Sequence, residues 1–203
     1  MDLNSFAIGV DLGQRRDHTA IAVVERDTRD VVMVRHVERV PLGTSYPRVV
    51  ERVREIALSE RLAGRCSVAV DATGVGAPVV EMLRAARLGC EVAAVTITGG
   101  ERETQTVVGW NVPKRDLIAG VQVLLESGDL RISGGLRELR ALTREMVDVR
   151  ITPRPGRFGG EGVGAERAGE HDDLVLALAL GVWKLGRVKG RIGFVGRRLV
   201  GVY

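Results

Sequence analysis

The chain has 203 residues, 45% of them hydrophobic and 28% charged, which excludes a disordered chain and fits one sizeable globular domain. Aromatic residues make up only 3%, which argues against a protein that binds nucleic acid mainly by stacking bases on aromatic side chains. With two cysteines and no apolar run of transmembrane length, the sequence predicts a cytoplasmic protein rather than a membrane or disulfide-rich secreted one.

The net charge of +4 is unevenly distributed along the chain. The last thirty residues carry six bases and no acid, whereas the residues before them carry 24 bases and 26 acids. A basic tail of this kind favours a polyanion such as DNA, although a solvated tail accounts for the same charge equally well. We therefore expect one domain over residues 1–187 and a basic C-terminal tail over residues 188–203.

The first half of the chain predicts the order β-β-β-α-β-α-β. Its opening apolar run is typical of a strand buried in the centre of a sheet. Two further strands with a short polar loop between them predict an antiparallel meander, and helical and extended patterns then alternate. The predicted strands cover residues 6–10, 19–25, 31–40, 67–70 and 91–97, and the predicted helices cover residues 46–62 and 77–88.

Helical patterns dominate the second half. Pro113 is suited to the first turn of a helix, and Gly-Asp at 128–129 interrupts the pattern that follows it. Residues 153–169 are rich in glycine and polar side chains, which predicts a mobile loop. The last predicted helix is strongly apolar and should pack into the core. The predicted helices cover residues 113–127, 136–146 and 173–185, with extended pieces at 130–132 and 147–152.

Acidic side chains stand at the ends of three of these buried elements. Asp11 follows the first strand, Asp71 follows the strand at 67–70, and Asp172 and Asp173 open the last helix. Taken singly, each is explained as well or better by a turn aspartate that bonds its own backbone or by a helix cap. The motifs gain weight only as a set.

As a set, these carboxylates favour a metal site. Functional groups gather at strand ends in α/β sheets, and two adjacent carboxylates repel each other unless a cation is near. Carboxylate oxygens suit Mg²⁺ or Mn²⁺ better than zinc, and the three histidines lack the spacing of a zinc site.

At this point the sequence resembles a known family, the nuclease domain of phage large terminase subunits. The resemblance extends over residues 6–185, and the order and spacing of its short motifs agree with that family. It implies a ribonuclease H-like α/β fold, in which helices flank a central mixed sheet of five or more strands. The motifs that carry it are Gly-Val-Asp-Leu-Gly at 9–13, Val-Asp-Ala-Thr-Gly-Val-Gly at 70–76, Val-Pro-Lys-Arg-Asp-Leu at 112–117 and His-Asp-Asp-Leu-Val-Leu-Ala at 171–177.

The resemblance also implies an activity, namely metal-dependent hydrolysis of duplex DNA during phage genome packaging in the host cytoplasm. Asp11, Asp71 and Asp172 would be the catalytic, metal-binding triad for two Mg²⁺ or Mn²⁺ ions, with Asp173 as an auxiliary ligand. Asp11 would bridge the ions because it ends the central strand. The implied partners are double-stranded DNA and a packaging ATPase, a small terminase or a portal protein.

Four basic residues are candidates for contact with the DNA backbone: Lys114, Arg154, Arg157 and Arg167. A solvated lysine at a helix start and a solvated loop account for them as well. The sequence contains no Walker A motif, so we expect either an excised nuclease domain or a free-standing relative without motor activity.

Two other functions remain open at this stage, and a third resemblance is weighed against the length of the chain. A Holliday-junction resolvase of the RuvC type uses a similar set of acids in a chain of comparable length. A non-catalytic module that binds DNA or a capsid protein through its basic tail is the second alternative. The string Asp11-Leu12-Gly13 also resembles a phosphate loop of the sugar kinase, actin and Hsp70 superfamily, but that fold needs two such domains and this chain is too short.

Overall fold

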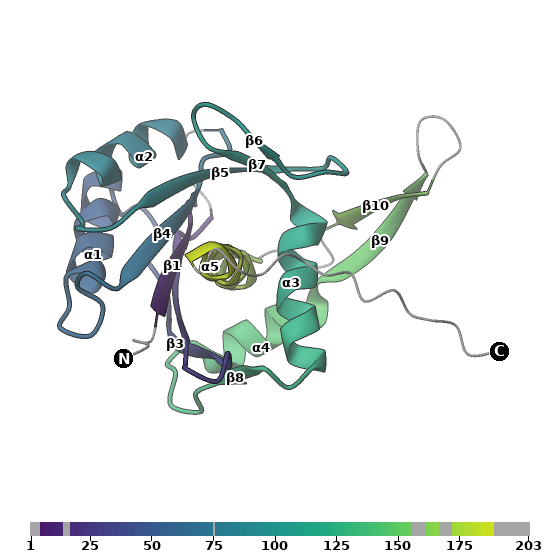
Figure 1. The fold of residues 1–203 in the computed structure, drawn as a ribbon. Coiled ribbons are helices and arrows are strands. Elements are labelled where there is room, and N and C mark those ends of the chain that lie inside the picture. Colours follow the sequence, from purple (N-terminus) through teal and green to yellow (C-terminus); the bar gives the residue numbers. More distant parts are fainter. Residues whose placement is uncertain (1–4, 14–16, 75, 156–160, 167–171, 189–203) are drawn as a thin grey trace.

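The structure is a computed structural model, and it describes residues 5–13, 17–74, 76–155, 161–166 and 172–188. Within these residues, eight strands form one mixed sheet with helices on both faces, and two more strands form a separate hairpin (Figure 1). Across the sheet the strands are β6 (Thr104–Gln105), β7 (Trp110–Pro113), β5 (Val92–Thr98), β4 (Cys66–Asp71), β1 (Ser5–Asp11), β2 (Ala20–Arg26), β3 (Val32–Arg39) and β8 (Leu130–Ile132). The predicted α/β fold with a central mixed sheet is confirmed.

The central strand is β1, as its apolar sequence predicts. It pairs antiparallel with β2 and parallel with β4, and residues 6–11 are all buried. The chain is apolar here because helices cover the sheet on both faces at this position. The predicted meander of β1, β2 and β3 is confirmed by two antiparallel ladders.

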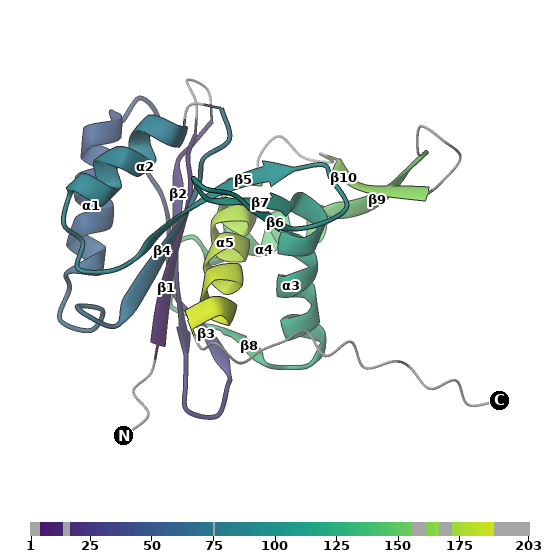
Figure 2. The same ribbon diagram turned by 45° about the horizontal axis from the view of Figure 1, so that its top comes forward.

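The helices lie in two layers, one on each face of the sheet (Figures 1 and 2). On one face lie α1 (Tyr46–Ala57) and α2 (Gly76–Ala85), and on the other lie α3 (Lys114–Glu126), α4 (Leu139–Asp148) and α5 (Asp173–Val188). Of the helices in the described part of the chain, none is long and apolar enough to cross a membrane.

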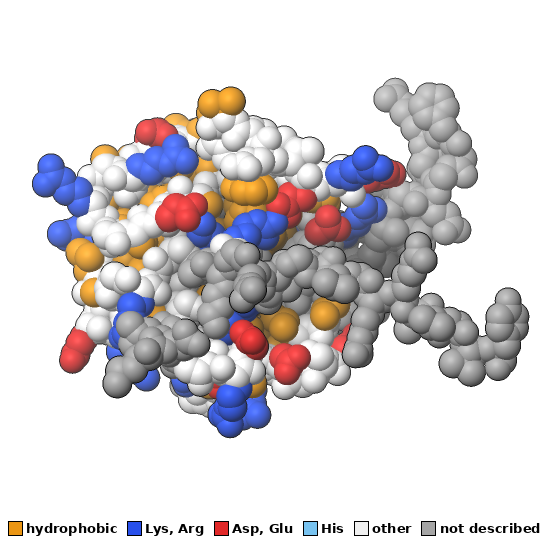
Figure 3. Space-filling model, viewed as in Figure 1, with side chains coloured by type: hydrophobic (Ala, Val, Ile, Leu, Met, Phe, Trp, Pro, Cys, Tyr) orange, Lys and Arg blue, Asp and Glu red, His pale blue; other side chains and the backbone are white. Residues whose placement is uncertain are grey.

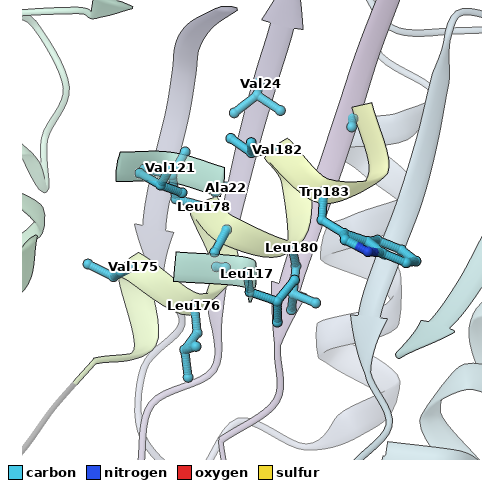
Figure 4. Packing of buried hydrophobic residues seen from close by; sticks show 14 of the residues in the cluster. Ala22, Val24, Leu117, Val121, Val175, Leu176, Leu178, Leu180, Val182 and Trp183 are labelled. Atoms are coloured by element: carbon cyan, nitrogen blue, oxygen red, sulfur yellow. The ribbon is translucent and has the colours of Figure 1, made fainter. Parts of the chain in front are cut away.

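The long helix α5 lies against the middle of the sheet and is enclosed by its neighbours. Apolar side chains from its whole circumference are buried, which explains its uninterrupted apolar sequence. Figure 4 shows this packing, with Leu178, Leu180 and Val182 of α5 among Ala22 and Val24 of β2 and Leu117 and Val121 of α3.

The backbones of α5 and β1 touch at a pair of glycines. A Cβ atom built on Gly9 would lie 1.9 Å from the carbonyl oxygen of Ala177 and 2.5 Å from the nitrogen of Gly181. A Cβ atom built on Gly181 would in turn lie 3.8 Å from the carbonyl oxygen of Ala7. Later residues of α5 therefore lie over earlier residues of β1, so the two elements run in opposite directions, and any side chain at Gly9 would force them apart.

One prediction about local structure is wrong, and one pair of strands was missed. The loop predicted over residues 153–169 contains strand residues, because β9 (Arg150–Pro155) and β10 (Glu161–Glu166) form an antiparallel pair. The short pair β6 and β7 was not predicted at all. In both places backbone hydrogen bonds make the ladder, and these depend little on which side chains the strands carry.

Candidate metal centre

Asp11 and Asp71 are brought together by strand register. Strands β1 and β4 are parallel neighbours, and Val10 pairs with Val70. The next residue in each strand is the aspartate, so both carboxylates lie at the same edge of the sheet. This is the edge at which the sequence predicts a site.

The turn after β4 holds Asp71 in place. Its Oδ1 accepts a hydrogen bond of 2.8 Å from the backbone N–H of Thr73, and the Thr73 hydroxyl oxygen accepts one of 3.0 Å from the N–H of Ile97 in β5. A Cβ atom on Gly76 would lie 2.4 Å from the carbonyl oxygen of Asp71, so the start of α2 also requires a glycine. The turn function of Asp71 is thus real, and it fixes the carboxylate at the strand end.

The glycine contact between β1 and α5 places the other two acids, Asp172 and Asp173, at the same edge of the sheet. Asp173 precedes Ala177 by one helical turn, about 6 Å along α5, and Asp11 follows Gly9 by two residues, about 7 Å along β1. Because the two elements run in opposite directions, both steps lead to the same edge. The start of α5 therefore lies beside the end of β1, and Asp172 and Asp173 join the two strand-end carboxylates.

The electrostatics of these groups reflect their closeness. Burial raises the pKa of Asp11 well above its usual value, and repulsion from Asp71, Asp173 and Asp172 raises it further, while Lys114 acts in the opposite sense. Burial also raises the pKa of Asp71, against hydrogen bonds to Thr73 and to Asp11 that lower it. The carboxylates therefore resist simultaneous ionisation, and a nearby cation would relieve that resistance.

Lys114 belongs to the same cluster. It is the first residue of α3, directly after β7, and its Nζ donates a hydrogen bond of 2.5 Å to Oδ2 of Asp172. The ammonium group is thus bound to a candidate ligand at the edge of the sheet.

The donor set fits a hard divalent cation, since it consists of carboxylate oxygens at one edge of the sheet. As arranged, no three His, Cys, Asp or Glu side chains in the described part of the chain converge closely enough to enclose an ion. Two of the four candidate ligands, Asp11 and Asp173, are buried, and Asp11 is repelled by the other three, which is an environment that favours a bound cation.

Of the other basic candidates, the structure describes the position of Arg154. Arg154 is in β9, opposite Gly162 of β10, and the hairpin extends away from the sheet beside α3 (Figure 1). Arg157 and Arg167 lie outside the described residues, as do residues 189–203 of the predicted tail.

The sequence analysis missed two residues beside the cluster, Glu145 of α4 and Arg39 at the end of β3. Glu145 is buried and accepts a hydrogen bond of 3.0 Å from the backbone N–H of Val175 in α5, and it is also bonded to Arg39. One signal was available: Glu145 lies three residues after Leu142, on the buried face of an otherwise amphipathic helix.

Comparisons with known proteins give a consistent picture. The family described as the Terminase RNaseH-like domain matches residues 8–184. The large terminase nuclease from thermophilic phage G20c is similar, with 23% identity and a TM-score of 0.60 over 89% of this chain and 82% of that one. The nuclease domain of the large terminase subunit gp2 of bacterial virus Sf6 has 14% identity and a TM-score of 0.62 over 89% of this chain and 87% of that one.

One longer protein is also similar. The large terminase of bacteriophage HK97 has 16% identity and a TM-score of 0.58, over 88% of this chain but only 39% of that one. A search of curated proteins gives no match. Because the family match covers most of the chain and includes Asp11, Asp71 and Asp172, the chain belongs to the terminase ribonuclease H-like domain family.

Proposed function

We propose that this domain is a metal-dependent endonuclease that cleaves duplex DNA during phage genome packaging. The observation that carries the proposal is the convergence of three elements, β1, β4 and α5, which bring Asp11, Asp71 and the Asp172–Asp173 pair to one sheet edge. Family membership supports it, and two of the similar terminase nuclease structures, from SPP1 and Sf6, contain manganese.

The proposed ligands are Asp11, Asp71 and Asp172, with Asp173 as an auxiliary ligand, for two Mg²⁺ or Mn²⁺ ions. When bound, such ions would activate a water molecule and stabilise the leaving 3′ oxygen. Asp11 is suited to bridging them, because it is buried on the central strand and is repelled by each of the other three carboxylates.

Lys114 has a second part in this proposal. Its ammonium neutralises Asp172 in the arrangement described here. A cation bound by Asp172 would compete for the same oxygen, and the ammonium would then be available to a DNA phosphate. Lys114 thus provides positive charge at the position where the backbone of the substrate must approach.

Arg154, Arg157, Arg167 and the basic tail are proposed to contact the DNA backbone. Acidic and basic side chains are interspersed over the face of the body seen in Figure 3, which fits an attraction to DNA supplied by these basic residues. The proposed partners are duplex DNA and a packaging ATPase, a small terminase or a portal protein, in the host cytoplasm.

The test is a cleavage assay with supercoiled plasmid, in Mg²⁺, in Mn²⁺ and in EDTA. We expect nicking and linearisation that require the metal and that fall by about 100-fold or more in Asp71→Asn, since loss of a ligand should exceed the effect of losing a residue that merely supports one. The matched control is Asp129→Asn, an exposed aspartate beside the first residue of β3, at the opposite end of the sheet.

Three results would count against the proposal. Faster cleavage of a four-way junction than of linear duplex would favour a resolvase of the RuvC type. DNA binding without cleavage in any metal would reduce the domain to a binding module. Equal activity of Asp71→Asn and wild type would show that the cleavage does not come from this site.

A further inference from the structure

The buried carboxylate of Glu145 is unusual because it serves an element other than its own. Glu145 lies on α4, yet its Oε2 accepts the N–H of Val175 in the first turn of α5 at 3.0 Å. The N–H of Leu174 also bonds to this carboxylate, and Arg39 of β3 donates a hydrogen bond to its other oxygen, Oε1.

The first turn of α5 needs such an acceptor. The first N–H groups of a helix have no partners within the helix, and a side chain at the N-cap usually accepts one of them. Asp172 occupies that position, since its carbonyl oxygen accepts the first helical hydrogen bond, from Leu176 at 2.9 Å. Its side chain is engaged with Lys114 instead. Glu145 therefore supplies from another helix the cap that Asp172 would ordinarily provide.

The position of Glu145 is electrostatically unfavourable for a carboxylate. Burial raises the pKa of Glu145, and repulsion from Asp173 raises it further, against the N–H of Val175 and the charge of Arg39. A neutral acceptor would cap the helix without that repulsion. Arg39 is paired with the carboxylate, and the N–H of Val175 that it accepts lies two residues after Asp173.

We infer that Glu145 is a positioning residue, which fixes the first turn of α5 so that Asp172 and Asp173 face Asp11 and Asp71. The inference rests on the proposed metal site and deepens it. Any rotation of this turn would move both carboxylates, because they belong to the N-cap and first helical residue. Held by Glu145 on one side and Lys114 on the other, the turn presents its carboxylates in one orientation.

The test measures Mn²⁺ affinity by calorimetry, with no DNA present. In Glu145→Leu, which cannot accept the N–H groups, we expect the dissociation constant to rise by about 10- to 100-fold, as is typical when a residue supporting a metal ligand is lost. In Glu145→Gln, which keeps an acceptor oxygen, we expect the rise in the dissociation constant to be less than about a tenth of the rise in Glu145→Leu. In the cleavage assay, the Mn²⁺ concentration for half-maximal rate should rise while KM for DNA stays unchanged.

Glu25 provides the matched control. It is equally buried, and it is bonded to Arg35 of β3 as Glu145 is bonded to Arg39, but it lies toward the other end of β2. Glu25→Gln and Glu25→Leu should lower the unfolding temperature without changing Mn²⁺ affinity.

The outcomes separate this inference from the proposed function. If wild type binds Mn²⁺ and a folded Glu145→Leu binds it as tightly, the positioning role is overturned. If Glu145→Leu does not fold, Glu145→Gln decides the question: a loss of Mn²⁺ affinity of about 10-fold or more, although an acceptor oxygen is kept, overturns the capping role as well. If wild type itself binds no Mn²⁺, the metal site fails, and the inference fails with it.

Discussion

The two ends of α5 differ in charge balance. At the C-terminal end, Lys184 pairs with Glu91 at 2.7 Å, and Arg187 is bonded to Glu103 and lies over the ring of Trp183. At the N-terminal end, the described residues include four carboxylates beside the ammonium group of Lys114, and a further acid, Glu145, is paired with Arg39. One helix therefore joins a region of balanced charge to a region with an excess of negative charge.

The difference separates side chains that stabilise the fold from side chains that are arranged for a chemical function. Paired charges at the C-terminal end join α5 to Glu91, just before β5, and to Glu103, just before β6, and lower the free energy of the folded state. Crowded carboxylates at the N-terminal end raise it, and a protein keeps such a cost where a ligand is to offset it. Substitutions at the two ends should therefore have opposite effects on stability and on activity.

The largest expected effect is that of Asp11→Asn. We expect DNA cleavage to fall by about 100-fold or more, because the proposed bridging ligand is lost. In EDTA, however, the unfolding temperature should rise by about 2–4 °C for each kcal/mol of repulsion removed. Calorimetric melting in EDTA and in Mn²⁺ checks both halves of the prediction. A lowered unfolding temperature in EDTA would mean that the acidic end is not strained by its own charge.

The C-terminal end should respond in the reverse way to Trp183→Ala. This side chain is nearly buried, meets Trp110 edge-to-face at 5.8 Å between ring centres and donates a hydrogen bond of 3.0 Å to Glu103. We expect unfolding in guanidinium chloride to show a loss of about 3 kcal/mol, typical of removing a large aromatic side chain from a core. Cleavage measured well below the melting temperature should stay within about twofold of wild type. A much larger loss of cleavage would show that the two ends of α5 are coupled.

The smallest effect is expected for a carboxylate that is fully satisfied, Glu38 of β3. Arg52 of α1 donates two hydrogen bonds of 2.8 Å to it. Burial acts to raise the pKa of Glu38, but the close contact with His36 and the hydrogen bonds from Arg52 outweigh it and lower that pKa to about 2. Since the folded-state pKa lies below the usual 4.5, the stabilisation is complete above pH 4.5 and is lost as the pH falls through about 2.

Glu38→Gln should therefore lose about 1 kcal/mol of unfolding free energy at pH 7, a figure that allows for partial exposure to solvent. The difference from wild type should vanish as the pH falls from 5 toward 2. Asp11 has the opposite sign: its raised pKa means that stability in EDTA declines as the pH rises above its usual 3.8, and Asp11→Asn should weaken that decline. Denaturant titrations over this pH range measure both slopes. Parallel slopes in the two variants would remove the distinction between paired and crowded carboxylates.

Local sequence patterns were sufficient for most of the framework. The apolar runs before Asp11 and Asp71 and the apolar helix after Asp172 each report their own burial, because a strand or helix covered on all sides has to be apolar at every position. Placing the acids at the ends of these runs required nothing beyond the sequence. Their convergence at one edge followed from the fold that the motifs implied.

The tertiary structure decided what depends on partners distant along the chain. Lys114 meets Asp172 across 58 residues, and Glu145 meets Val175 across 30, so no local pattern marks either contact. The β9–β10 hairpin is made by backbone bonds in a glycine-rich stretch that has no strong side-chain pattern. The sequence by itself determined which acids stand at the ends of buried elements, because an uninterrupted run of apolar residues predicts that a strand or helix is buried. Only the tertiary structure decided which groups orient and neutralise them, because those groups are brought there by packing.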